Sequence, residues 1–264
     1  MRSESFQPSE RLRPFVLAIR VVETDTDTGK ESATISAPLP EAGLILAIRY
    51  AGRAELIEGT AAHAVPDATL TGVRTAVRRI RTSPGGGVVV APFRAIGAMQ
   101  FFDAPLHELF GGMAALLDLA RAHEVDRLQT CLAEAGTTAQ RAAIVDRYLC
   151  SRLNARRPDP VVAAAVSAIG RARGAIRIAP LARELGLSTD RLEKRFRRIV
   201  GASPKQLASV LRFRRVVARY RAGVTLTQLA HDAGYFDQSH LIRDFRSFTG
   251  QPPGEFLRAG GYWM

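Results

Sequence analysis

Short apolar runs separated by Gly and Pro fill the first hundred residues, a pattern typical of strands joined by turns. Each run has the length of a strand of about five to eight residues. We therefore expect a β-rich N-terminal half, folded as a sandwich or small barrel. The TSPGGG segment, 82–87, lacks the Lys-Ser/Thr of a phosphate-binding loop, and we interpret it as a hairpin turn. The runs are FVLAIRVV (15–22), LILAIRY (44–50), AELIEG (54–59), VRTAVRRIRT (73–82) and GGVVVAPFRAIGAMQFF (86–102).

After Pro105 the apolar spacing becomes helical. We expect one helix over 105–120, broken at Gly111 and Gly112, and further helices over DRLQTCLAEA (126–135) and AQRAAIVDRYLCSRL (139–153). The polar segment NARRPDP predicts a linker at 154–160. The expected domains are 1–153 and 161–260. The apolar positions of the first helix are Leu106, Leu109, Phe110, Met113, Leu116, Leu117 and Ala120.

Short, capped helices are expected beyond the linker. Ser203, Pro204 and Gln206 supply an N-cap, a proline at the first helical position and a capping-box partner. Thr225 with Gln228 repeats this arrangement. Gly201 and Gly250 stand where helices should end, at positions that need φ > 0.

One motif occurs twice in this region. LARELGLSTDRLEKRFRRIVGASPKQL (181–207) aligns with LAHDAGYFDQSHLIRDFRSFTGQPPGEF (229–256), matching Gly186 with Gly234, Phe196 with Phe245 and Gly201 with Gly250. Each copy predicts a short helix, a glycine-containing turn and a second helix with apolar residues four apart. That is a helix-turn-helix unit, whose second helix lies in the major groove of DNA.

The exposed face of each second helix has the residue types that contact DNA. Gln and Arg make bidentate contacts to base edges, whereas Ser at a helix start and Arg further along suit phosphates. Ser188 and Asp237 are the expected N-caps. In a single copy, such a polar helix face could be exposed only to solvent. Two copies with glycine turns at matching positions favour DNA binding. The polar positions are Asp190, Arg191, Glu193, Lys194, Arg197 and Arg198 in the first copy, and Gln238, Ser239, His240, Arg243 and Arg246 in the second.

A helix from Pro204 to Arg221 is expected between the two copies. At 1.5 Å per residue it spans about 27 Å. A stiff spacer of that length suits the roughly 34 Å between successive major-groove faces. The chain is thus predicted to read two adjacent turns of duplex.

Charge supports this interpretation, because it is uneven along the chain. The net charge is +12, and residues 158–264 hold 18 Lys+Arg against 8 Asp+Glu, whereas residues 1–157 hold 19 against 17. A basic surface attracts polyanions, of which nucleic acid is the commonest.

Two cysteines, Cys131 and Cys150, cannot form a disulfide framework. With no apolar run of membrane-spanning length and no signal-peptide pattern, we expect a cytoplasmic protein.

Residues 160–258 resemble the DNA-binding domain of the AraC/XylS transcriptional regulators. The resemblance is carried by both copies, by the RFRRVVARY segment and above all by the pattern A-x-x-x-G-[FY]-x-D-x-S-H-[FL]-x-R-x-F-[KR], followed by G-x-x-P, at 230–253. It implies a seven-helix domain with two helix-turn-helix units on one connecting helix. It also implies double-stranded DNA as partner, with RNA polymerase as a second partner if the protein is an activator.

The resemblance assigns base contacts to Asp190, Glu193 and Lys194 in the first unit and to Gln238, Ser239, His240 and Arg243 in the second. The acidic Asp190 and Glu193 depart from a phosphate-binding face, so the first unit either accepts from cytosine N4 or makes few base contacts. The full set of expected DNA-binding residues is Ser188, Thr189, Asp190, Arg191, Glu193, Lys194, Arg197, Arg198, Lys205, Asp237, Gln238, Ser239, His240, Arg243 and Arg246.

The N-terminal half is similar to cupin-like sensor halves of the same family, so the expected fold class is α+β. The class combines a cupin-like β domain, with appended helices, and an all-α domain with two helix-turn-helix units. In relatives the N-terminal half binds a small effector or forms a homodimer, and both alternatives stay open, because no motif fixes effector-binding residues. A cupin-type enzyme is a third alternative, but His63, His107 and His123 are isolated in the sequence. We therefore expect no catalytic residues, no metal and no cofactor.

Overall fold

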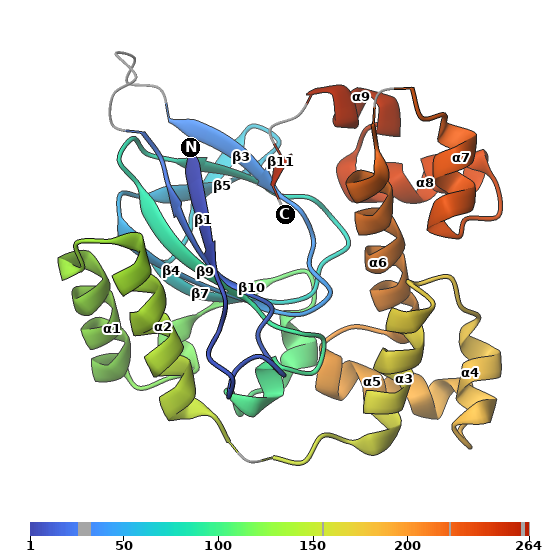
Figure 1. Ribbon diagram of the computed structural model, residues 1–264, viewed down its shortest axis with the longest axis horizontal. Helices are drawn as coiled ribbons and strands as arrows, with labels where there is room; N and C mark the ends of the chain where they lie inside the picture. Colours follow the sequence, from blue (N-terminus) through green and yellow to red (C-terminus); the bar gives the residue numbers. More distant parts are fainter. Residues whose placement is uncertain (26–32, 155, 222, 260–261, 264) are drawn as a thin grey trace.

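The chain folds into a β-rich N-terminal part and a helical C-terminal part, as seen in a computed structural model (Figure 1). The structure describes residues 1–25, 33–154, 156–221, 223–259 and 262–263. The predicted α+β class is confirmed. One residue of the expected linker, Ala155, and the final residue of the expected second domain, Gly260, lie outside the described residues.

Two sheets face each other in the N-terminal part, as in a sandwich. The six-stranded sheet has the order β1-β2-β9-β4-β7-β10, and the five-stranded sheet has the order β11-β3-β8-β5-β6. The strands of the first sheet are β1 (Arg2–Phe6), β2 (Ile19–Glu23), β9 (Gly87–Pro92), β4 (Ile45–Ala51), β7 (Ala68–Thr71) and β10 (Met113–Ala115). Those of the second are β11 (Tyr262–Trp263), β3 (Thr34–Pro38), β8 (Arg79–Thr82), β5 (Ala54–Glu58) and β6 (Ala61–Ala64).

Side-chain alternation along β4 gives the six-stranded sheet two different faces. Leu46 and Ile48 are fully buried in the hydrophobic core. Ile45, Ala47 and Arg49, at the alternate positions, line a cavity between the sheets. The face opposite the cavity packs against the helices α1 (Ala122–Glu134) and α2 (Thr138–Arg152), which lie on the left in Figure 1. Both helices were expected from the sequence.

The segment 105–120 does not form the helix that its apolar spacing predicts. It contains the 3₁₀ helix η2 (Leu106–Leu109), the strand β10 and the 3₁₀ helix η3 (Leu116–Asp118). Gly111, with φ +71°, ends the first turn, and Met113 then pairs with Thr71 at the edge of the sheet. One side of β7 pairs with β4, and its other side offers backbone hydrogen bonds to 113–115. Two glycines prevent this stretch from forming a continuous helix.

The strand predictions are right in position but too long. Of 73–82 only β8 is strand, and of 86–102 only β9, which is followed by the 3₁₀ helix η1 (Ala98–Gln100). The turn at 82–87 joins β8 of one sheet to β9 of the other, so the hairpin predicted there is wrong. The chain must cross from sheet to sheet at this point, where Gly87 lies against the ring of Tyr50.

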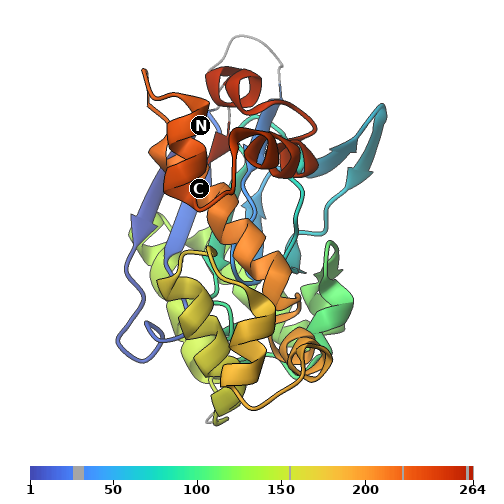
Figure 2. The same cartoon turned by 90° about the vertical axis from the view of Figure 1, so that its right-hand side faces the viewer.

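The C-terminal part consists of helices around a central one, α6, seen face-on in Figure 2. Gly174, Gly186 and Gly223 have positive φ in the turns between them. The helices are α3 (Pro160–Arg171), α4 (Ile178–Glu184), α5 (Thr189–Val200), α6 (Pro204–Arg219), α7 (Leu226–Ala233), α8 (Gln238–Thr249) and α9 (Pro253–Ala259).

The two parts pack directly against each other. The backbone N–H of Val77 donates to the carbonyl of Phe248 at 2.6 Å, and helix α5 packs on η2. Strand β11, which follows the last helix, pairs in parallel with β3, with Tyr262 opposite Ala37 (Figure 1). The helical part therefore contributes a strand to the sheet that forms one wall of the cavity.

Candidate nucleic-acid interface

Two helix-turn-helix units lie at opposite ends of α6. The first is α4 with α5, and the second is α7 with α8 (Figure 1). Leu192 and Phe196 of α5, and Leu241 and Phe245 of α8, are fully buried, as their four-residue spacing predicts. This burial turns the remaining faces of α5 and α8 toward solvent.

Both second helices begin and end in the same way. The side chain of Ser188 accepts from the N–H of Arg191, and that of Asp237 accepts from the N–H of His240. Gly201 and Gly250 cap the C-terminal ends at φ +81° and +73°. The caps and breaks predicted from the repeat are confirmed, so the two units share one backbone design.

The helix between the units has the predicted start. Ser203 and Gln206 form a capping box, Pro204 is in the first turn, and Thr225 with Gln228 caps α7. The helix ends at Arg219, two residues before the predicted end, because Tyr220 is already extended. Its 16 residues correspond to about 24 Å. Lys205 is exposed in its first turn.

The first unit presents cations and acids together. Ser188, Thr189, Asp190, Arg191, Lys194 and Arg198 are exposed. Glu193 and Arg197 are half-exposed and form an ion pair along the helix, with 2.6 Å between Arg197 Nη2 and Glu193 Oε1. A pair of this kind neutralises Glu193 and fixes the direction of the Arg197 guanidinium.

The fourth arginine of α5, Arg195, pairs with a residue of α3's N-terminus. Arg195 donates from Nε to Asp159, which is also the N-cap of α3. Burial alone would raise the pKa of Asp159, but the hydrogen bonds from Arg195 and from the N–H groups of Val162 and Val161 hold it below its usual value. Arg195 thus joins α5 to the start of α3.

The second unit has a more open polar face. Asp237, Gln238, Ser239, Arg243 and Arg246 are exposed. The side-chain oxygen of Gln238 accepts from the hydroxyl of Thr227 on α7 at 3.1 Å, so the bond to α7 uses the oxygen of the amide and not its NH₂ group. His240 is half-buried, because its ring lies edge-on against Tyr235 with 5.2 Å between centroids.

A buried polar cluster holds α8 on α6. Asp244 accepts from the hydroxyls of Ser209 and Tyr235, both at 2.9 Å, and lies 3.6 Å from Arg212. Burial and the adjacent Asp244 carboxylate raise the pKa of Tyr235, so its hydroxyl stays protonated and donates. The cluster fixes the rotation of α8, and hence which side chains face solvent.

One exposed residue beside the second recognition helix was missed in the sequence. Phe236 is 94% exposed in the turn directly before the Asp237 cap. A Phe is ordinarily predicted to be buried in the core. In the sequence, only the position of Phe236 next to the Asp237 cap indicates that its ring could be exposed.

The cavity between the two sheets is a second candidate site. Its volume is about 110 Å³, and Arg20, Arg49 and Arg74 line it together with Glu41 and with apolar side chains of both sheets. Among the described residues no group of three His, Cys, Asp or Glu side chains is placed to hold a metal ion. In the same residues no helix has the length and apolar character needed to cross a bilayer. Cys131 and Cys150 are free and partly buried.

Residues 181–259 match the family model described as helix-turn-helix domain. The search against curated proteins gives no match. The fold is similar to ToxT from Vibrio cholerae in its P21 form, at 14% identity and TM-score 0.48, over 97% of this chain and 98% of that chain. A DNA-binding transcriptional dual regulator from Escherichia coli K-12 is similar at 26% identity and TM-score 0.33, over 40% and 96%. The AraC-like transcriptional activator CuxR is similar at 13% identity and TM-score 0.24, over 85% and 89%.

Proposed function

We propose that this chain is a DNA-binding transcription regulator of the AraC/XylS family and that it reads two adjacent major-groove segments with α5 and α8. The match of residues 181–259 to a helix-turn-helix model supports the proposal. The observation that carries the proposal is the duplicated unit on one spacer helix. Each copy has the same caps, the same buried apolar stripe and a polar face turned to solvent. One helix of about 24 Å between them matches the scale of one turn of duplex DNA.

The second unit is the main reader of bases in this proposal. Gln238 has a side-chain amide oriented by Thr227, and Arg243 presents an exposed guanidinium five residues further along α8. Gln recognises adenine and Arg recognises guanine through paired hydrogen bonds. Ser239 and His240 complete the base-contacting set, and Arg246, near the end of the helix, contacts phosphate.

The first unit contributes fewer base contacts. Lys194 is free to reach a base, and Asp190 accepts from cytosine N4. Glu193 is engaged by Arg197, so it orients that guanidinium toward the backbone instead of reading a base. Ser188, Thr189, Arg191, Arg198 and Lys205 provide phosphate contacts.

The N-terminal sheet domain, 1–153, serves as the sensor in this proposal, and 161–260 as the DNA-binding domain, with 154–160 between them. A small effector in the cavity between the sheets controls DNA affinity, and no catalytic step is assigned. The alternative is a domain that only dimerises. Helix pair α1 and α2 supports that alternative, since it covers the outer face of the sheet and leaves its own outer side exposed.

Selection of DNA fragments by the purified full chain tests the proposal. We expect enrichment of a motif with two blocks about 10 bp apart and an affinity that falls steeply with salt. Fragments without any shared motif, at every salt concentration, would overturn sequence-specific binding.

Thermal denaturation separates the two roles of the N-terminal domain. An effector raises the melting temperature progressively once its concentration exceeds its dissociation constant, at constant protein concentration. A domain that only dimerises has a melting temperature that depends on protein concentration and on no small molecule.

A further inference from the structure

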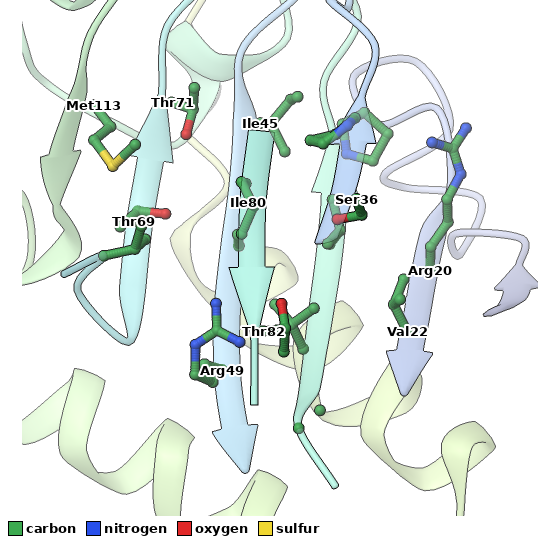
Figure 3. A pocket seen from close by; sticks show the side chains of 18 of the residues that line it. Arg20, Val22, Ser36, Ile45, Arg49, Thr69, Thr71, Ile80, Thr82 and Met113 are labelled. Carbon is green, nitrogen blue, oxygen red and sulfur yellow. The ribbon is translucent and has the colours of Figure 1, made fainter. Parts of the chain in front are cut away.

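The cavity between the sheets contains a buried arginine whose hydrogen-bonding groups are largely unused. Arg49, on β4, is 8% exposed, and its Nε lies 3.8 Å from the exposed Asp67. Within the described residues its Nε and Nη1 have no hydrogen-bond partner. Figure 3 shows the guanidinium pointing into the space that Thr69, Ile80 and Thr82 border.

The other arginines of the cavity are already engaged. Arg74 donates to the backbone carbonyls of Pro38, Leu39 and Ala76. These bonds hold the buried guanidinium in the wall of the cavity, so Arg74 has a structural role. Arg20 lies 3.5 Å from the buried carboxylate of Glu41. Among the lining arginines of the described chain, Arg49 is thus the one that offers buried, unbonded nitrogens to a ligand.

An arginine in this position is costly for the fold on its own. Burial lowers the pKa of Arg49, against the opposing effect of Asp67, yet a guanidinium stays charged at any ordinary pH. The charge therefore remains poorly compensated until an anion reaches it. A carboxylate suits it best, because its two oxygens match two parallel N–H groups of a guanidinium.

The remaining walls define the rest of the ligand. Ile45, Ile80 and Val90 give an apolar surface, and Thr69 and Thr82 add hydroxyls near the arginine. The volume is about 110 Å³, and a cavity of roughly 150 Å³ takes benzene, so the ligand has at most about six non-hydrogen atoms. A sugar would leave the guanidinium without a counter-charge, and phosphate would bring more charge than one free arginine balances.

We propose that this cavity binds a small organic monocarboxylate, whose carboxylate pairs with Arg49 and whose short chain lies between Ile45, Ile80 and Val90. The proposal names the ligand class of the effector site and so rests on the proposed function. Binding requires both the negative charge of the carboxylate and a chain that fits the cavity. The neutral amide of the same acid has the shape without the charge, so it should not bind.

Thermal denaturation of the full chain with three probes tests the ligand class. Butyrate should raise the melting temperature progressively with its concentration, while butyramide and inorganic phosphate, at matched ionic strength, should not. Equal stabilisation by butyrate and butyramide would overturn the proposal. So would the absence of any effect from propionate and butyrate alike.

Two variants locate the site. Arg49→Gln should raise the dissociation constant for butyrate about tenfold or more, since a hydrogen bond to a charged group is lost. Arg79→Gln is the matched control, because Arg79 is exposed on β8, beside Ile80 but outside the cavity lining. It should leave the constant unchanged. Wild-type affinity in Arg49→Gln would contradict the assignment, and if that variant does not fold, the comparison of acid and amide in the wild type decides.

DNA affinity measured with and without butyrate separates this inference from the proposed function. Arg49-dependent butyrate binding with no change in DNA affinity would support the ligand class and overturn effector control. A neutral molecule that changes DNA affinity independently of Arg49 would support effector control and overturn the carboxylate class.

Discussion

The carboxylate of Glu41 lies 2.9 Å from the guanidinium of Arg214, so a residue of the cavity wall is paired with α6, the central helix of the C-terminal part. Glu41 is 5% exposed and also pairs with Arg20 on β2. Arg214 in turn donates to the carbonyl of Pro40 at 3.0 Å. One buried carboxylate therefore joins the sheet, the cavity and α6.

Loss of this carboxylate should weaken the docking of the two domains. Glu41→Gln is expected to lower the free energy of unfolding by about 1 to 3 kcal/mol, since two partly buried arginines lose their charged acceptor. Urea denaturation of the full chain measures the change. Glu55→Gln is the control, because Glu55 pairs with Arg81 at 3.0 Å where both side chains are more than 40% exposed. That surface pair should contribute less than about 1 kcal/mol, and equal losses in the two variants would contradict the role of Glu41.

Two arginines of α8 should have different effects on DNA binding. Arg243→Ala should cost about 1 to 3 kcal/mol on the selected site and relax one base position. Arg246→Ala should weaken binding to all sequences to a similar degree and reduce the salt slope by about 1. Titrations of specific and random duplexes distinguish them. Equal losses on both duplexes for Arg243→Ala, or a selective loss for Arg246→Ala, would reverse the two assignments.

The exposed ring of Phe236 should matter for DNA binding and not for stability. Phe236→Ala should change the free energy of unfolding by less than about 0.5 kcal/mol, because the ring has almost no contacts to lose. It should reduce affinity by about 1 to 2 kcal/mol, through lost apolar contact with thymine methyl groups. Leu117→Ala removes another exposed apolar side chain, in the N-terminal domain, and should not affect binding. Unchanged DNA affinity in Phe236→Ala would remove this residue from the interface.

The matched glycines of the repeat test how the first unit docks. At Gly250, with φ +73° and no atom near an added Cβ, Ala should cost about 1 to 2 kcal/mol from the backbone conformation alone. At Gly201 the Cβ would lie 2.9 Å from the carbonyl oxygen of Leu106 in the N-terminal domain, so Gly201→Ala should cost more. Denaturation of both variants gives the comparison. If both variants lost the same free energy of unfolding, the contact between Leu106 of η2 and the end of α5 would not contribute to stability.

The repeat could be predicted from sequence because its signals are local. Glycines at Gly201 and Gly250, and caps at Ser188 and Asp237, depend on a few neighbouring residues and fix where helices start and stop. The helix predicted over 105–120 failed because pairing of Met113 with Thr71 is a long-range contact that spacing alone does not reveal.

The cavity could not be predicted for a related reason. In the run LILAIRY, Arg49 is expected to be an exposed arginine near the end of a strand. It is buried because the second sheet faces β4. The pairing of Glu41 with Arg214 joins residues far apart in the chain, in two different domains. Phe236 went unnoticed because nothing local distinguishes an exposed ring from a buried one.

Footprinting of the full chain on a selected duplex tests the central claim most directly. The account predicts two protected segments about one helical turn apart on one side of the duplex. Lys194→Ala should weaken one segment and Arg243→Ala the other. A single protected segment, or loss of both segments in either variant, would contradict the assignment of one recognition helix to each groove.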